Sequence, residues 1–492
     1  MDCARSNLAF SSVEFPDSKV VRMSALRFML IAGEPSGDSL AAEFVQAFRQ
    51  LPQVRAMPWP PEFFGAGGPR MSETGVELEI DLTAHAVFGI SDVLSQYFKF
   101  KGFFVRLFRL ALDRRPDAII LVDFGGFNLR FAEAIKRCVR SRVSAFSNWN
   151  PKIIHYVSPQ VWASRAGRAY QLARNADLLL SIFPFEKAWY AGRVPQLRVE
   201  FVGHPMVDRY VNAESGGTSE NRRGVVSERS GSPHPNPLPR GEGTQSSSDP
   251  LIEPARLVEA RKSTLPLPKG QGRGEGKGHA FTAAASWESS TRQARNVTDS
   301  HPLILLLPGS RKREIEAHLP GMVGAVQQIK ASRPIRLRMV LPNPELAEFA
   351  SSIVRLPQWL EVRTQGLAES LTEADLAIAS SGTVTLECAY FHVPTVVLYK
   401  TSRLTYEIAK RIITVKHIAM PNLLAGEMVY PELIQGDVTA EAIAGAALAF
   451  LNDPARVAGL KPKLTKVVES LGRPGASTRA AEAVLKVIRN PS

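Results

Sequence analysis

Cysteine is scarce in this chain of 492 residues, which contains only Cys3, Cys138 and Cys388. The three are far apart and form none of the short paired spacings that are typical of zinc sites. A disulfide framework needs several closely spaced pairs, so the sequence excludes that class as well. The simplest prediction is a protein of a reducing compartment, with no bound metal and no cofactor.

Long apolar runs are also missing. No stretch of the sequence approaches the roughly 18 uncharged apolar residues that a transmembrane helix needs. Residues 1–24 contain six charged side chains and no long apolar segment, which argues against a secretory signal. We therefore expect residues 1–24 to be an N-terminal extension, or the result of a start codon assigned too early, in a protein that does not span the membrane.

Acidic residues are fewer than basic ones, 47 against 60, and the formal net charge is +13. An excess of basic side chains favours anionic partners such as an anionic membrane surface or anionic substrates. It is equally compatible with a solvated surface or with nonspecific affinity for nucleic acid. Charge by itself does not choose between these interpretations.

Residues 214–300 differ in composition from the rest of the chain. They contain 11 of the 35 glycines and 8 of the 35 prolines, and the run beginning Pro237-Leu-Pro-Arg-Gly recurs as Pro266-Leu-Pro-Lys-Gly. Such a segment has too little apolar surface to offset the entropy lost on ordering. We interpret it as a disordered insertion; a tail that binds phosphate or RNA is the functional alternative.

The insertion separates two segments in which strands and helices alternate. Apolar strands are expected at Leu26–Ala32, Ala118–Val122, Lys152–Val157 and Leu178–Phe183, and then at Leu303–Leu307, Arg338–Leu341, Leu376–Ala379 and Thr395–Tyr399. Alternation of this kind predicts parallel sheets with helical crossovers, whose ligands bind at the carboxyl ends of the strands. The predicted domains are residues 25–213 and 301–470, followed by a C-terminal helix in 471–492 that packs back on the first domain.

Three motifs of the first segment place polar residues directly after strands. Glu34, Ser36 and Asp38 lie in a glycine turn where a helix N-terminus could bind an anion or a sugar hydroxyl. Asp123 ends a buried strand, where a carboxylate can act as a general base; a helix cap or a structural acceptor is the alternative. Gln160 and Arg165 flank Trp162 in a polar loop and are hard to explain as core.

Two motifs of the second segment suit a nucleotide diphosphate. Gly309, Ser310 and Arg311 follow one strand at a helix start, where backbone N–H groups, the helix dipole and a guanidinium converge. The Gly-Lys-Ser/Thr ending of a Walker loop is absent. The second motif comprises Ser381, Gly382 and Thr383, with Glu387 about one turn further on, where its carboxylate could accept from both ribose hydroxyls.

Residues 93–111 interleave aromatic and basic side chains. Phe103, Phe104 and Phe108 alternate with Lys101 and Arg106. This pattern is typical of a helix that lies in a membrane interface, with aromatic rings in the bilayer and basic groups at the phosphate headgroups. A buried helix with a basic outer face would have the same pattern.

These motifs, in this order, resemble those of the lipid-A-disaccharide synthase family. The resemblance also includes the runs Gly89-Ile-Ser-Asp-Val93 and Pro421-Asn-Leu-Leu-Ala-Gly426, and it covers both segments without the insertion. It implies a GT-B fold: two Rossmann-like domains that face each other across a cleft, in an inverting glycosyltransferase without a bound metal. The implied location is cytoplasmic, peripheral on the inner face of the inner membrane, where anionic lipids are the partner and nucleic acid is not.

The resemblance also implies roles for individual residues. Arg311 would contact the diphosphate of UDP and Glu387 its ribose, Asn422 would lie near the donor, and Asp123 would match the general base. The donor would be UDP-2,3-diacylglucosamine and the acceptor 2,3-diacylglucosamine 1-phosphate. The family commonly has Asp-x-Pro-Asp-Phe-Asn where this chain has Asp123-Phe-Gly-Gly-Phe-Asn128, so Gly126 replaces a second acid.

Two other functions are compatible with the same motifs. An enzyme that resembles UDP-N-acetylglucosamine 2-epimerase would share the nucleotide half but would need neither the basic aromatic helix nor an acylated acceptor. A catalytically inactive protein that binds a nucleotide sugar would keep the fold despite the Gly126 replacement. The sequence leaves open whether the protein is a monomer or a homodimer.

Overall fold

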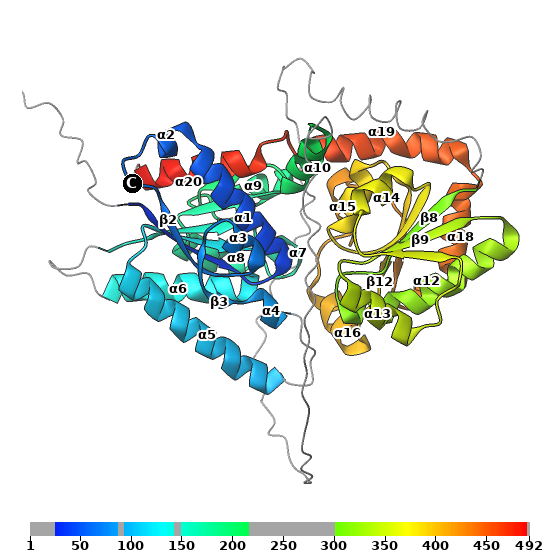
Figure 1. Ribbon diagram of the computed structural model, residues 1–492, viewed down its shortest axis with the longest axis horizontal. Helices are drawn as coiled ribbons and strands as arrows, with labels where there is room; N and C mark the ends of the chain where they lie inside the picture. The colour runs from blue at the N-terminus through cyan, green and yellow to red at the C-terminus, as the bar shows by residue number, and fades with distance from the viewer. Residues whose placement is uncertain (1–24, 87–92, 142–148, 216–300, 490–492) are drawn as a thin grey trace, which may run out of the picture.

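The computed structural model describes residues 25–86, 93–141, 149–215 and 301–489, which form two α/β domains side by side (Figure 1). The expected N-terminal extension lies outside these residues. So does the expected insertion, apart from its first two residues, which end a helix, and so does most of the Gly89–Val93 motif.

The N-terminal domain is built on a sheet of seven parallel strands. The spatial order is β3 (Glu77–Asp81), β2 (Glu62–Gly67), β1 (Arg27–Ala32), β4 (Ala118–Val122), β5 (Lys152–Tyr156), β6 (Leu178–Ser181) and β7 (Val199–Phe201). The central strands β1 and β4 are paired in parallel and buried throughout β4 and almost throughout β1. Continuous apolar runs are expected for strands covered on both faces, and the strands predicted here are confirmed.

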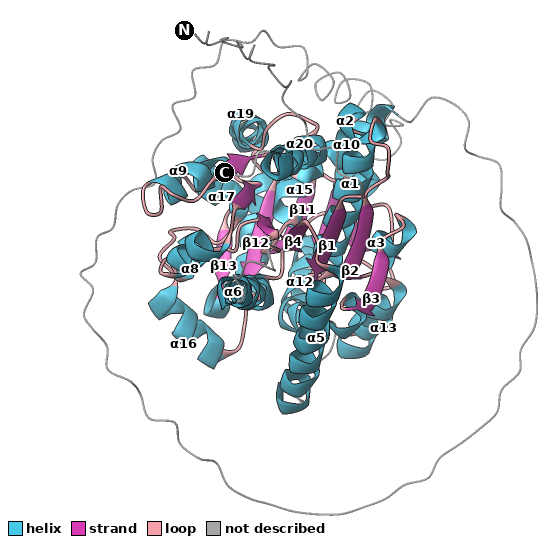
Figure 2. Ribbon diagram, turned by 90° about the vertical axis from the view of Figure 1, so that its left-hand side faces the viewer, coloured by secondary structure: helices cyan, strands magenta, loops and turns pink. Residues whose placement is uncertain are grey.

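Helices cover both faces of this sheet (Figures 1 and 2). They are α1 (Pro35–Gln50), α2 (Pro52–Arg55), α3 (Pro69–Glu73), α4 (Thr83–Ala86), α5 (Val93–Arg114), α6 (Gly125–Ser141), α7 (Val161–Ser164), α8 (Arg168–Asn175), α9 (Pro184–Ala191) and α10 (Pro205–Ser215). Helix α1 begins at Pro35, directly after the glycine turn. Pro35 at its first position suits this start, since proline has the helical φ and lacks only an N–H that would be unpaired there.

The C-terminal domain has six parallel strands in the order β10 (Leu360–Arg363), β9 (Arg336–Val340), β8 (Leu303–Leu307), β11 (Leu376–Ser380), β12 (Thr395–Tyr399) and β13 (Glu432–Ile434). Its helices are α12 (Lys312–Ser332), α13 (Pro344–Ile353), α14 (Leu367–Glu373), α15 (Val384–Tyr390), α16 (Arg403–Ile412), α17 (Met420–Ala425), α18 (Ala440–Leu451) and α19 (Pro454–Ser470), with a 3-10 turn at Gln435–Asp437. In both sheets the strand order reverses next to the first strand, which places a topological switch point between β1 and β4 and between β8 and β11.

The chain returns to the first domain after α19. Helix α20 (Ala476–Arg489) packs against α1 and joins the apolar core of the N-terminal domain (Figure 1). Its start is held by Asp208, whose carboxylate accepts backbone N–H bonds from Gly475, Ala476 and Ser477 at 2.6 to 3.2 Å. Two chain crossings therefore connect the domains, one beyond α10 and one before α20.

Candidate active site

Asp123 follows β4 at the switch point of the N-terminal sheet. Its φ of +32° lies in the left-handed region, which Asp adopts more readily than most residues. Its backbone N–H donates to the carbonyl of Tyr156 on the neighbouring strand β5 at 3.1 Å. The end of the sheet thus holds this aspartate in an unusual backbone conformation, a feature often found at functional sites.

The glycine turn after β1 packs directly against the loop that carries Asp123. A side chain at Gly33 would place its Cβ 2.3 Å from the ring of Phe124, so only glycine allows this approach. Phe124 in turn lies 6.1 Å from Phe100 of α5, measured between ring centroids. The first motif, the Asp123 loop and α5 therefore form one contiguous region.

An ion pair joins the two domains at this region. The guanidinium of Arg311, at the start of α12, lies 2.7 Å from the carboxylate of Glu34, at the start of α1. Asp123 keeps an exposed edge but is otherwise surrounded by protein. Burial and, to a smaller extent, the charge of Glu34 raise the pKa of its carboxyl to about 6, while the charge of Arg311 opposes that rise. Three residues predicted from separate motifs thus act on one another across the domain boundary.

The other residues predicted for the first glycine turn have different environments. Ser36 is exposed in the first turn of α1. Asp38 is buried, and its carboxylate accepts backbone N–H bonds from Gly68, Arg70 and Met71 at 2.8 to 3.1 Å. The carboxylate of Asp38 therefore holds the start of α3.

The predicted diphosphate motif lies at the start of α12. Gly309 has φ +131°, a backbone conformation that glycine tolerates best, and Ser310 and Arg311 are exposed. The backbone N–H of Ser310 donates to the carboxylate of Glu314 at 2.9 Å. An anion that used this N–H would have to displace Glu314, whereas the guanidinium of Arg311 is held only by exposed carboxylates.

The second nucleotide motif lies between β11 and α15. Gly382 and Thr383 are exposed there, and Ser381 is half-buried, with its backbone N–H donated to the carbonyl of Leu398 at 2.8 Å. Glu387, on α15, accepts a hydrogen bond from the hydroxyl of Tyr210 and lies close to the charge of Arg209. Both partners belong to α10 of the other domain. The spacing of the motifs did not reveal them, because Tyr210 and Glu387 are 177 positions apart.

Asn422, which was predicted to lie near the donor, is bonded within the C-terminal domain. It is fully buried, its amide donates to the carbonyl of Tyr430 and to Glu432 at 2.7 Å each, and its oxygen accepts from the backbone N–H groups of Val429 and Tyr430. These four bonds use the hydrogen-bonding capacity of the side chain. Asn422 therefore joins α17 to the segment before β13 and has no polar atom left for a donor sugar.

We expect Asn422→Ala to lower stability without changing the affinity for nucleotide. The substitution leaves several buried backbone groups unpaired, which costs roughly 3 kcal/mol. Asn343→Ala is the matched control, because Asn343 makes a single cap bond to Leu346 and its loss costs about 1 kcal/mol. Thermal unfolding with and without UDP is the measurement. A folded Asn422→Ala protein that no longer binds UDP would return this residue to the donor site.

Gln160 and Arg165 are exposed on either side of α7. Trp162 between them is buried, and its indole N–H donates to the buried carboxylate of Glu186 at 2.9 Å. The backbone of the same turn meets the C-terminal domain, since the N–H of Thr414 donates to the carbonyl of Ala163 at 2.9 Å. Gln160 and Arg165 thus lie on a rigidly held turn at the domain boundary.

Helix α5 presents its aromatic residues inward, contrary to expectation. Phe103, Phe104 and Phe108 pack partly buried against the core; Phe104 lies 5.5 Å and Phe108 6.5 Å from the ring of Phe131 on α6. Helix α6 therefore covers Phe104 and Phe108 in part. Within the described part of the chain, no helix is long and apolar enough to span a membrane.

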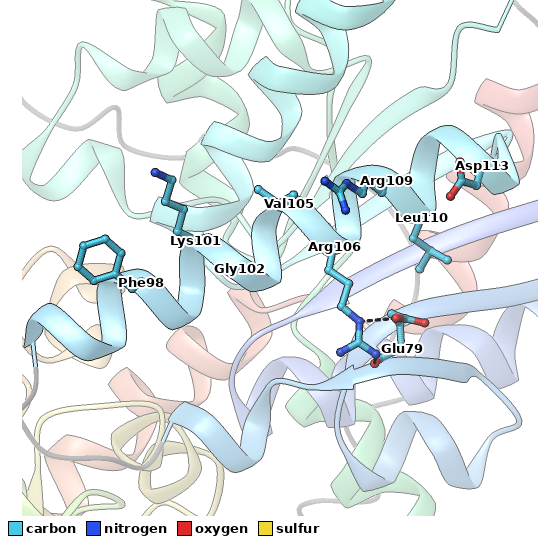
Figure 3. A pocket seen from close by; sticks show the side chains of 9 residues that line it. All are labelled: Glu79, Phe98, Lys101, Gly102, Val105, Arg106, Arg109, Leu110 and Asp113. Atoms are coloured by element: carbon cyan, nitrogen blue, oxygen red, sulfur yellow. Dashed lines mark hydrogen bonds and ion pairs between the residues drawn. The ribbon is translucent and has the colours of Figure 1, made fainter.

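The outer face of α5 bears a different set of residues. Phe98 and Val105 are 61% and 42% exposed, and they alternate with the basic residues Lys101 and Arg109 (Figure 3). These side chains, with Arg106, line a shallow hollow whose acidic members are Glu79 and Asp113. Arg106, which was predicted to meet the phosphate headgroups, forms an ion pair with Glu79 on β3. The exposed stripe of apolar and basic residues therefore lies on a different side of α5 from the predicted stripe of Phe103, Phe104 and Phe108.

Two Rossmann-like parallel sheets, with polar and charged residues meeting where their domains touch, define the GT-B class of glycosyltransferases. The UDP-N-acetylglucosamine 2-epimerase of Neisseria meningitidis, solved with UDP-GlcNAc, has the same fold. It aligns with a TM-score of 0.52 at 11% identity, over 94% of this chain and 99% of its own.

The family follows from the sequence comparisons. The model of the lipid-A-disaccharide synthetase family matches residues 28–228 and 278–487. Lipid-A-disaccharide synthase of Anaeromyxobacter dehalogenans is 32% identical over 94% of this chain and 98% of its own length. Lipid-A-disaccharide synthase 1 of Legionella pneumophila is 31% identical over 91% and 94%. The chain belongs to the lipid-A-disaccharide synthase family, as its motifs predicted, and its likeness to an epimerase is one of fold.

Proposed function

We propose that this protein condenses UDP-2,3-diacylglucosamine with 2,3-diacylglucosamine 1-phosphate, which yields the β-1,6-linked lipid A disaccharide 1-phosphate and UDP. The observation that carries the proposal is the meeting of Asp123, Glu34 and Arg311 at the domain boundary. A carboxylate from one domain and a guanidinium from the other lie where an acceptor hydroxyl and a donor diphosphate would react.

In this mechanism Asp123 is the general base. Its pKa of about 6 leaves it mostly ionised at neutral pH, yet makes it a stronger base than an ordinary aspartate. It removes the proton from the acceptor hydroxyl as that oxygen attacks the anomeric carbon from the face opposite UDP. A side chain added at Gly126 would meet no atom within 4 Å, so the absent second acid of the family motif is not excluded by packing.

The leaving group is stabilised by the C-terminal domain. Arg311 exchanges Glu34 for the diphosphate, whose two charges make it the stronger partner. Breaking the ion pair between Arg311 and Glu34 costs little free energy, because that pair is exposed and exposed ion pairs contribute little to stability. The remaining phosphate and sugar contacts come from Gly309, Ser310, Ser381, Gly382 and Thr383. Glu387 accepts hydrogen bonds from the ribose hydroxyls. The acceptor is contacted by Gln160 and Arg165.

The test is to incubate the purified protein with both acylated sugars and to follow disaccharide and UDP by mass spectrometry. Donor alone is the control that separates the alternatives. Epimerisation of the donor without an acceptor would support the epimerase function instead. Stoichiometric UDP binding with no product from either reaction would support the inactive binding protein.

We also propose that α5 holds the protein on the cytoplasmic face of the inner membrane. Phe98 and Val105 would enter the interface while Lys101 and Arg109 meet anionic headgroups. The inner side of the same helix reaches the Asp123 loop through Phe100 and Phe124. A lipid-linked acceptor could therefore pass from the bilayer surface to the base over a short distance.

Replacing Phe98 and Val105 with Ser, and Lys101 and Arg109 with Glu, should abolish sedimentation with anionic liposomes. The variant loses the free energy of burying the two apolar side chains in the membrane interface. It also loses the attraction of each basic residue to anionic lipids, about 1 kcal/mol per residue. UDP binding should not change. Lys463→Glu with Lys466→Glu, on α19 far from α5 (Figure 1), is the control for charge and should leave sedimentation nearly intact. Equal release by both variants would mean that binding depends on net charge alone.

A further inference from the structure

The N-terminal domain supplies the polar partners of Glu387. The ring of Tyr210 on α10 lies 5.1 Å from that of Tyr390 and 4.9 Å from that of Phe391, at the end of α15. From this contact its hydroxyl donates to the Glu387 carboxylate. The neighbouring Arg209 is fixed on the other side by Glu43 of α1, at 2.7 Å.

This arrangement acts on the pKa of the Glu387 carboxyl. Burial raises the pKa of Glu387 to about 7, and the charge of Arg209 and the hydrogen bond from Tyr210 oppose that rise. On its own helix, the neighbouring Cys388 thiol is buried, and burial also raises the pKa of that thiol. A carboxylate can accept from two ribose hydroxyls only while it is ionised and suitably turned.

We propose that Tyr210 is a positioning residue for the nucleotide, whose hydroxyl orients Glu387 toward the ribose diol from the opposite domain. The inference rests on the proposed donor site, since Glu387 must be the ribose ligand. It adds that this site is built from both domains. One oxygen of Glu387 accepts from Tyr210, which leaves the remaining lone pairs for the two ribose hydroxyls.

Tyr210→Phe is the decisive variant, because it removes the hydroxyl and keeps the ring against Tyr390 and Phe391. Calorimetry with UDP should show an affinity about 3- to 10-fold lower, the size of one hydrogen bond. With 2′,3′-dideoxy-UDP, which lacks the diol, wild type and variant should bind equally. Adding Tyr210→Phe to Glu387→Gln should change UDP affinity little, since the group that Tyr210 orients has been replaced.

The pH dependence gives an independent readout. Loss of the Tyr210 hydroxyl removes an effect that lowers the pKa of Glu387, so that pKa should rise. The fall in UDP affinity as the pH is lowered from 8 to 6 should therefore begin at a higher pH in Tyr210→Phe. Glu387→Gln provides the baseline, because its profile contains the titration of UDP itself but not that of the carboxylate.

Unchanged or tighter UDP binding by Tyr210→Phe would overturn the inference, the latter by showing that Tyr210 competes with the ribose. An equal loss for UDP and the dideoxy nucleotide would overturn it as well, since that loss would come from general structure. In these two cases the proposed donor site is still supported if Glu387→Gln weakens the binding of UDP. If Glu387→Gln instead binds UDP with wild-type affinity, Glu387 does not contact the ribose, and both the proposed donor site and the inference are contradicted.

Discussion

Asp123→Asn should lower turnover of the two acylated sugars by about 10²- to 10⁴-fold, the usual contribution of a positioned general base. Asparagine has nearly the same shape and can keep the turn after β4, but it has almost no basicity. UDP affinity and melting temperature should stay near the wild-type values, because the side chain makes no hydrogen bond to any residue that the structure describes and is not proposed to touch the nucleotide.

The pH profile identifies the base more directly. Because the pKa of Asp123 in the free protein is about 6 and the base must be ionised, kcat/KM should fall as the pH drops through about 6. Glu34→Gln removes a negative charge that raises this pKa, so the acid limb should move to lower pH. Arg311→Ala removes a charge that lowers it, so the limb of its residual activity should move to higher pH.

Two results would contradict the assignment. A loss of activity accompanied by a lower melting temperature would make Asp123 a structural residue. Near-normal turnover of Asp123→Asn would transfer the role to Glu34 or Asp38 of the first glycine turn. Glu34 would be tested first, because its carboxylate faces Arg311 of the other domain, whereas that of Asp38 accepts backbone N–H bonds at the start of α3.

Arg311→Ala should weaken UDP binding by about 10- to 150-fold. The substitution removes a charged partner of the diphosphate, and a hydrogen bond to a charged group contributes about 1.5–3 kcal/mol. Calorimetry at fixed salt is the measurement, since the interaction is screened. Turnover at saturating donor should fall too, because the departing UDP loses its counter-charge.

Glu34→Gln is the matched control for the same contact. It breaks the interdomain pair from the other side but leaves the guanidinium free for UDP. We expect its UDP affinity to be unchanged or slightly higher. If both variants lose affinity equally, the pair acts by holding the domains together, and Arg311 has no direct contact with the diphosphate.

Much of the fold could be predicted from local pattern. The strands Ala118–Val122, Leu303–Leu307 and Thr395–Tyr399 were predicted with the bounds that they have in the structure. Continuous apolar runs between polar turns specify buried parallel strands, because a strand covered on both faces must be apolar along its length. The carboxyl ends of such strands then collect the motifs that follow them, which is why Asp123, Glu34 and Arg311 were named in advance.

Several residues of the motifs have partners that the sequence did not indicate, and the cause is shared. Asp38 and Asn422 are polar residues in glycine-rich or polar motifs, and the sequence does not show whether a polar group meets a ligand or a backbone. Both satisfy buried N–H groups of segments that lie 30 and 7 to 8 positions away. The aromatic side of α5 was misassigned for a similar reason, since a helix with two candidate faces is oriented only by its neighbour, here Phe131 of α6.

The sequence by itself determined the two α/β domains, the family and the residues to consider, because each is encoded in short-range pattern and in the order of motifs. The tertiary structure alone decided which of those residues share a site. Glu34 and Arg311 are 277 positions apart and Tyr210 and Glu387 are 177 apart. Their contacts depend on how the two domains pack against each other, and no local preference of the chain records that packing.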